Sequence, residues 1–248
     1  MKRNFVFCLL FALVMALNSC SNDLDEVFNK SNKSVVTRAI TYDFRKIVES
    51  ETDATLLSYL NSALVDVCSH KEYDFLYQVD VSKGYAFASA VVDPNIPEPA
   101  TATYNVENRT LAFYTASAAN ELTLTEEFLH MNQHYLYNGL GKYWTKGMSN
   151  IEFEAKFVQD VINYRINVFT QLLGRGDGHI NDYYDLMDKF KKTEDFPVFS
   201  EVKDGVNGCN WWTFVEDFRT TNSHIKPYAV PVDGTLEGKL VNFIGKNN

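Results

Sequence analysis

The sequence predicts an α+β fold in which a small antiparallel sheet is followed by a mainly helical part. Short runs rich in aromatic and β-branched residues, separated by turn-forming residues, occupy much of the segment 73–115. Two longer segments after residue 120 place apolar residues at helical spacing. The 248 residues are 46% hydrophobic, so the chain is long enough to bury a large core without disulfide support. We therefore expect one domain in which the sheet precedes the main helices.

The first twenty residues have the pattern of an export signal. Met1-Lys2-Arg3 is basic, and residues 5–17 are almost wholly apolar. This apolar run is shorter than the about 20 residues that a helix needs to cross a bilayer. We therefore predict a cleaved signal peptide over residues 1–19 rather than a permanent membrane helix.

The end of this segment, Leu17-Asn18-Ser19-Cys20, resembles the bacterial lipobox. The resemblance implies that Cys20 is acylated, becomes the new N-terminus and anchors the protein to a membrane of the cell envelope. The acidic residues that follow, Asp23, Asp25 and Glu26, resemble tags that send some outer-membrane lipoproteins to the cell surface. The alternative is an ordinary signal peptide with a chance cysteine. Polar residues 20–39 suit a flexible tether, which leaves a single domain over residues 40–248.

The acidic composition argues against nucleic acid as a partner. The chain has 23 Lys and Arg against 32 Asp and Glu, which gives a net charge of −9. No run of Lys or Arg exceeds two residues, so the chain lacks the basic patch that binds nucleic acid or anionic lipid. Any membrane attachment is therefore expected to come from the lipid anchor.

Two cysteines remain in the folded domain. Cys8 leaves with the signal peptide and Cys20 carries the lipid, so only Cys68 and Cys209 are left. An exported compartment permits a disulfide between them, but their separation in sequence says nothing about their distance. The sequence is therefore compatible either with one disulfide between Cys68 and Cys209 or with two buried thiols.

The first half of the domain is predicted to contain one helix and the sheet. Thr52-Asp53 can cap a helix that ends near His70, because the apolar residues between them recur at helical spacing. The predicted β regions that follow are Tyr73–Val81, Tyr85–Val92 and a hairpin of Ala102–Val106 with Thr110–Thr115.

The second half is predicted to be helical. The two main helices cover about Leu124–Tyr137 and Ile151–Leu173. Shorter helices are expected near Asn181–Lys191 and Trp211–Phe218. Between them, the glycine-rich residues 174–178 fit a helix end and a turn.

The first main helix has a polar face that contains metal-competent residues. Thr123 and Glu126 fit a capping box at its start. Opposite the apolar arc lie Glu126, Glu127, His130, Gln133 and His134. Glu126 and His130 are four residues apart, as are His130 and His134, so two or three of these side chains can converge on one ion. The alternative is a solvated polar face.

The second main helix has a carboxylate on its apolar face. Glu154 lies in the middle of that face, whereas Glu152 lies on the polar one. An ionised buried carboxylate is costly unless it is paired, protonated or bound to a metal. Arg165 is about three turns away, roughly 16 Å, which is too far to pair with Glu154 directly. Glu154 is therefore predicted to meet another cation or the polar face of the first helix.

Glu126-Glu127-x-x-His130, followed by Glu154, resembles the motif of the gluzincin branch of the zincin metallopeptidases, with Glu126 in place of the first histidine. The pattern also resembles bacterial lipoproteins with an E-E-x-x-H-x-x-Q helix and an E-x-E-A helix, matched here by Gln133 and by Glu152–Ala155. In gluzincins an aspartate often lies four residues after the last ligand, where this chain has Val158.

The resemblance implies a zincin-like domain with one divalent ion. Glu126, His130 and Glu154 would be its ligands, and His134 and Gln133 are further candidates. The ion would be zinc, or manganese or iron because carboxylates favour harder metals. Glu127 would be the catalytic base, and the strands that end at Thr115 would supply an edge along which a peptide substrate lies. The implied function is a metal-dependent hydrolase of peptides, and the alternative is a surface lipoprotein that binds a ligand or protein partner without catalysis.

Overall fold

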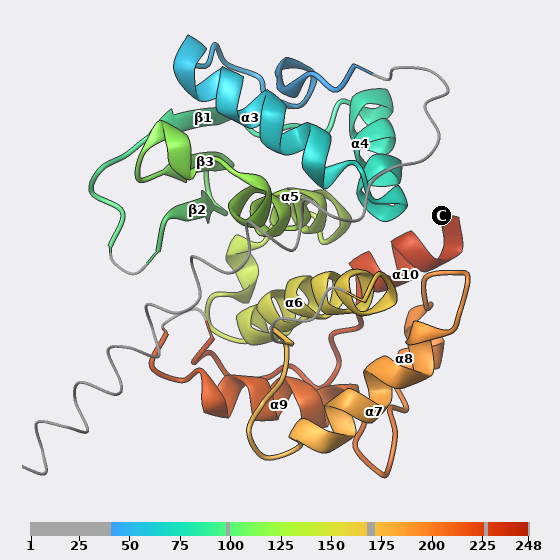
Figure 1. Cartoon of the computed structure of the whole chain (residues 1–248). Coiled ribbons are helices and arrows are strands. Elements are labelled where there is room, and N and C mark those ends of the chain that lie inside the picture. The colour runs from blue at the N-terminus through green and yellow to red at the C-terminus, as the bar shows by residue number, and fades with distance from the viewer. Residues whose placement is uncertain (1–40, 98–99, 168–171, 226–227, 248) are drawn as a thin grey trace, which may run out of the picture. The chain divides into compact units, whose positions relative to one another are not determined.

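The computed structural model describes residues 41–97, 100–167, 172–225 and 228–247. Residues 42–248 form one compact unit, an α+β arrangement of a small three-stranded sheet and a mainly helical remainder (Figure 1). The predicted signal peptide, Cys20 and the tether lie outside the described residues. Among the helices of the described part, none combines the length and the apolar character that crossing a membrane requires.

The unit begins with the short 3-10 helix η1 (Phe44–Ile47) and two α-helices, α3 (Ala54–Val67) and α4 (Lys71–Lys83). Asp53 caps α3 by accepting hydrogen bonds from the backbone N–H groups of Thr55 and Leu56, as the sequence predicted.

The predicted strand Tyr73–Val81 is wrong, because these residues belong to α4. The aromatic and β-branched residues of this segment favoured a strand. Its buried residues, however, recur every three or four positions, at Tyr73, Tyr77 and Asp80 among others. Tertiary packing of this face outweighs the β propensity, and Gly84, at φ 70°, ends the helix.

The sheet consists of β1 (Ser89–Val92), β2 (Ala102–Asn105) and β3 (Thr110–Phe113), in the order β1-β3-β2. The β2–β3 hairpin is antiparallel, as predicted. However, β1 pairs with β3 in parallel, so the sheet is mixed rather than antiparallel. Although β2 follows β1 in sequence, it takes an outer position, and β3 lies between β1 and β2.

Two helices form the centre of the helical part. They are α5 (Glu121–Leu136) and α6 (Met148–Arg165), and they pack against each other (Figure 1). Helix α5 begins three residues earlier than predicted. Asn120 and Thr123 form its capping box, whereas the prediction paired Thr123 with Glu126. Helix α6 ends at Arg165, well before Leu173, and Asn167 follows in the left-handed region at φ 59°.

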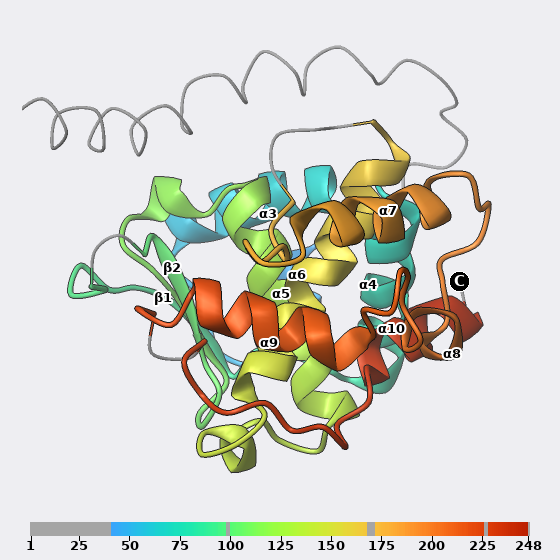
Figure 2. The ribbon, with the colours of Figure 1, turned by 90° about the horizontal axis from the view of Figure 1, so that it is seen from below.

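The remaining helices pack around these two. They are η2 (Ala116–Ala118), η3 (Gly141–Tyr143), α7 (Ile180–Lys191), α8 (Phe199–Val202), α9 (Trp211–Thr221) and α10 (Lys239–Asn247). Helix α6 contacts α5, α7, α9 and α10, and Figure 2 shows it among them. It is therefore buried on most of its circumference, including polar residues such as Gln159 and Asp160.

The two cysteines of the domain are both free and buried. Cys68 follows α3, and Cys209 precedes α9. Of the two alternatives left open by the sequence, the structure therefore has two buried thiols.

Candidate functional site

Helices α5 and α6 bring together five ionisable side chains, which we call the α5–α6 cluster: Glu126, Glu127, His130, Glu152 and Lys156. The Nε2 atom of His130 lies 3.4 Å from a carboxylate oxygen of Glu152 and 3.9 Å from one of Glu126. Ligand atoms of Glu126, His130 and Glu152 all lie within 4.8 Å of one another, so this group could hold a metal ion. The ammonium group of Lys156 forms an ion pair with Glu126.

Gln133 fixes the ring orientation of His130. Its amide nitrogen donates hydrogen bonds to the carbonyl oxygen of Ile151 and to Glu154, each 2.8 Å long. Because the nitrogen faces two acceptors, the amide oxygen faces Nδ1 of His130, at 2.9 Å. The Nδ1 atom therefore carries a proton, and Nε2 is directed at the carboxylates of Glu126 and Glu152. A hydrogen bond to the other ring nitrogen orients metal-binding histidines in this way.

The structure does not bring Glu154 into the α5–α6 cluster. Its carboxylate is fully buried and accepts four hydrogen bonds, from the Gln133 amide, the Tyr137 hydroxyl and the backbone N–H groups of Leu240 and Val241. The last two belong to the first turn of α10, so Glu154 joins α6 to the N-terminus of that helix. Burial raises the pKa of Glu154 to about 7, although these hydrogen bonds oppose the shift.

Glu152 takes the place that the sequence assigned to Glu154. The prediction correctly put Glu154 on a buried face and required a partner for it, but that partner is a set of hydrogen-bond donors. The sequence placed Glu152 on the polar face of its helix, but this face of α6 packs against α5 and borders the pocket described below. Lys156 was missed for the same reason. The i, i+4 spacing of Glu152 and Lys156 was the available signal.

The charges of the α5–α6 cluster balance without an ion. Burial alone would raise the pKa of Glu126, but Lys156 and His130 hold it below its ordinary value. Burial alone would lower the pKa of His130, but the carboxylates of Glu152 and Glu126 raise it well above its ordinary value. Two carboxylates, one ammonium and one imidazolium therefore sum to zero.

Glu127 differs from the two carboxylates beside it. Its side chain is buried, and burial raises its pKa to about 8, with His130 opposing the shift and Glu126 and Glu152 adding to it. At neutral pH Glu127 is therefore mainly protonated and can donate a hydrogen bond.

The α5–α6 cluster lies in a pocket of about 560 Å³. Along one side the pocket is lined by five consecutive residues from Ala100 to Tyr104, which include most of β2. Successive residues of a strand point to opposite faces, so the pocket follows the edge of β2 rather than one face. Apolar side chains complete the lining, among them Leu122, Trp144 and Tyr228.

The outer edge of β2 offers backbone groups to this pocket. Tyr114 donates a backbone hydrogen bond to Thr101, so the antiparallel alternation directs Thr103 toward β3, and Ala102 and Tyr104 away from it. No strand of the described residues pairs with this outer edge. The hydroxyl group of Tyr104 is buried and has no hydrogen-bond partner within the described part of the chain. The groups that this edge can offer to the pocket are therefore the outward backbone donors and acceptors of Ala102 and Tyr104.

His134 lies outside the α5–α6 cluster. Its ring packs edge-on against Tyr104 and Tyr135, with centroids 6.2 and 5.8 Å away. His134 follows His130 by four residues, which places it about 6 Å further along the helix axis and about 40° around it. This displacement directs His134 away from the cluster and toward the sheet. Burial and the positive charge of Arg109 lower its pKa.

A second group of side chains could also hold a metal ion. It consists of His179, Asp182 and Cys209, and we call it the His179 group. The sequence did not predict this group, and Cys209 was expected to be either a disulfide partner or a buried thiol. His179 and Asp182 are three residues apart at the start of α7, whereas Cys209 is distant in sequence and reaches them through the turn that precedes α9.

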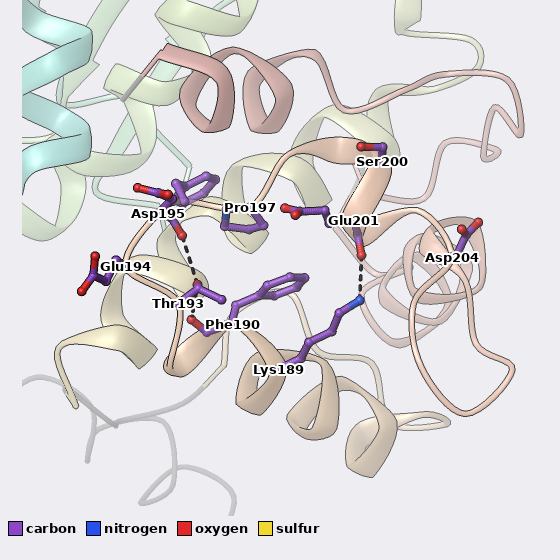
Figure 3. A pocket seen from close by; sticks show the side chains of 10 residues that line it. Lys189, Phe190, Thr193, Glu194, Asp195, Pro197, Ser200, Glu201 and Asp204 are labelled. Carbon is purple, nitrogen blue, oxygen red and sulfur yellow. Dashed lines mark hydrogen bonds between the residues drawn. The ribbon is translucent and has the colours of Figure 1, made fainter.

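Another hollow, of about 590 Å³, lies between the end of α7 and α8 (Figure 3). Two of its polar side chains are bonded locally: Thr193 donates to the carbonyl oxygens of Phe190 or Asp195, and Lys189 donates to that of Glu201. Figure 3 shows Glu194 and Asp204 at opposite ends of the hollow. Its lining contains neither of the two metal-competent groups found among the described residues.

Comparison of the chain with protein-family models, with curated proteins and with solved structures found no match in any of the three. A functional assignment therefore rests on the side chains and the pocket themselves.

Proposed function

We propose that this protein binds an extended peptide segment in the pocket between β2 and the α5–α6 cluster. The observation that carries this proposal is the course of the pocket along the outer edge of β2, with ionisable groups on its opposite side. An extended peptide can add to such an edge through main-chain hydrogen bonds, and the pocket then selects its side chains or its terminus. Ala102 and Tyr104 would supply the main-chain contacts, and Lys156 and Glu152 would meet charged groups of the peptide.

We also propose that Lys156 supplies the positive charge that a metal ion supplies in the gluzincins. With Glu152 as the third member of the site, the residue four positions later is Lys156, where gluzincins often have aspartate. Glu126 replaces a neutral histidine, and these two departures from the motif form an ion pair with each other. A divalent ion about 5 Å from the ammonium group would be repelled by about 7 kcal/mol at an effective dielectric constant of about 20. The cluster is therefore better suited to binding than to metal-dependent hydrolysis.

The second candidate function is a metal-dependent peptide hydrolase. The convergence of Glu126, His130 and Glu152 favours it, because two carboxylates and an imidazole suit zinc, manganese or iron. Such an ion would polarise a peptide carbonyl group. In this case Lys156 would have to release Glu126, and the carboxyl group of Glu127 would hold a proton during the reaction.

The lipid anchor at Cys20 completes the proposal. It would hold the domain at the outer membrane, where the tether lets the pocket reach peptides outside the cytoplasm. The partner would then be an exported peptide or protein.

Zinc content separates the two candidates. It is measured in chains that also contain Cys209→Ser, which disables the His179 group. We expect far less than one zinc per chain with Lys156 present, and one zinc per chain after Lys156→Ala, because removing the ammonium leaves the acidic group unbalanced. Adding Glu152→Gln should abolish this gain. Lys146→Ala is the matched control, since Lys146 is exposed and pairs with Asp233.

Incubation with a mixed peptide library, followed by mass spectrometry, completes the test. The proposal expects peptides to be retained and not cleaved. One zinc per chain with Lys156 in place, lost on Glu152→Gln and accompanied by peptide cleavage, would instead establish the hydrolase.

A further inference from the structure

The His179 group lies where two segments distant in sequence meet. His179 is the N-cap residue of α7, and Asp182 lies in the first turn of that helix. Cys209 lies in a tight turn closed by its backbone hydrogen bonds with Val206. None of the three residues lines the peptide pocket, so this group is separate from the α5–α6 cluster.

Three donor atoms of this group form a nearly equilateral triangle. The Sγ atom of Cys209 lies 3.1 Å from Nδ1 of His179 and 3.5 Å from Oδ2 of Asp182, and these last two atoms are 3.3 Å apart. Bonds of about 2.3 Å to sulfur and about 2.0 Å to nitrogen and oxygen, at tetrahedral angles, separate ligands by about 3.3–3.6 Å. The three atoms therefore match one face of a tetrahedral zinc site with little adjustment.

The same geometry argues against a Cys-His-Asp nucleophile. In such a relay one ring nitrogen faces the nucleophile and the other faces the carboxylate. Here the thiol and the carboxylate both approach the same atom, Nδ1 of His179. The three groups converge on one point instead of forming a chain.

Neighbouring groups hold the triangle in place. Asn207 donates a 3.0 Å hydrogen bond to Oδ1 of Asp182, which leaves Oδ2 for the centre of the triangle. Asp217 of α9 accepts hydrogen bonds from the backbone N–H groups of Gly178 and His179, 2.9 and 2.8 Å long. A Cβ atom on Gly176 would come within 2.2 Å of the Asp217 side chain, so the loop before His179 fits closely around that carboxylate.

We propose that His179, Asp182 and Cys209 bind one zinc-like divalent cation. The thiolate, the carboxylate and the neutral imidazole carry a charge of −2, which balances the ion. Binding forms the sulfur–metal bond as the Cys209 thiol releases its proton to water, so uptake depends on pH. A sulfur, nitrogen and oxygen donor set selects zinc over magnesium or calcium. The half-exposed His179 leaves the fourth position open to water or to a ligand from a partner.

Cobalt(II) tests this site selectively, because only a thiolate ligand gives sulfur-to-cobalt charge-transfer absorption in the near ultraviolet. The full chain, stripped of metal with a chelator, is titrated with Co²⁺ and then with Zn²⁺. We expect the band to saturate at one equivalent and to disappear as zinc displaces cobalt. Cys209→Ser should abolish the band, and Asp182→Asn should weaken Co²⁺ binding about tenfold or more.

Two variants serve as controls. Cys68→Ser removes the other thiol of the described residues, and Glu152→Gln disables the α5–α6 cluster; both should keep the band. The site is refuted if the folded wild-type chain gives no band at one equivalent, or if the band survives Cys209→Ser. Circular dichroism establishes folding, and Asp182→Asn provides the test if Cys209→Ser does not fold. Loss of the band in Cys68→Ser would also refute the assignment.

Discussion

Glu152 and Glu154 are two residues apart on α6, but their carboxylates have different partners. Glu152 faces His130 in the pocket, whereas Glu154 accepts four hydrogen bonds in the core. A gap of two residues turns the helix by about 200°, which directs the two side chains to opposite sides. Because α6 is covered on most sides, both directions lead into the protein, and the sequence pattern alone does not distinguish them.

This difference predicts unequal effects of the same substitution. Glu154→Gln should lower the free energy of unfolding by about 1–3 kcal/mol, because an amide nitrogen then faces buried donors. Glu152→Gln should stay within about 1 kcal/mol of wild type, since water reaches the pocket. Urea denaturation of both variants at pH 7 measures the two values. A larger loss for Glu152→Gln would contradict the assignment of Glu154 to the core.

Among the helices and strands, the sequence predicted the features that depend on residues close together in the chain. The capping aspartate of α3, the β2–β3 hairpin and the helices α7 and α9 follow from capping residues, turn residues and apolar periodicity. Helix α4 was misassigned because its aromatic and β-branched residues favour strands, while contacts with the rest of the domain decide the outcome.

The parallel pairing of β1 with β3 depends on contacts distant in sequence, and no local pattern encodes it. In the candidate site, too, contacts within one helix were predicted and contacts between elements were not. His130 and its neighbours on α5 were identified from helical spacing, since that spacing lies within one element. The roles of Lys156 and of the His179 group depend on which elements pack together, so spacing within one helix was the only signal for Lys156, and no local pattern joins Cys209 to His179 and Asp182.

At the scale of the whole molecule, several buried acids are shifted in one direction. Burial raises the pKa of Glu154 and of Asp160 to about 7 each, and that of Glu127 to about 8. Asp160 is held by the backbone N–H groups of Leu173 and Gly174. Between pH 5 and pH 8 the folded chain therefore binds protons that the unfolded chain has already lost.

The free energy of unfolding should consequently fall as the pH rises from about 5 to about 8. A shift of one pKa unit corresponds to about 1.4 kcal/mol, so Glu154 and Asp160 each contribute at most about 2–3 kcal/mol of this change. The net charge of −9 acts in the same direction, because repulsion grows as the remaining acids ionise. Urea midpoints across this range measure the trend, and Glu154→Gln should make it shallower. A midpoint that rises with pH would contradict the burial of these acids.

In the proposed complex an extended peptide adds to the outer edge of β2. Residue-resolved amide hydrogen exchange, with and without a peptide retained from the library, tests it most directly. The backbone N–H groups of Ala102 and Tyr104 face the pocket, whereas that of Thr103 faces β3. Bound peptide should therefore slow exchange at Ala102 and Tyr104 and leave Thr103 nearly unchanged. If saturating peptide leaves Ala102 and Tyr104 unchanged and protects amides elsewhere, the peptide does not bind along this strand and the claim is wrong.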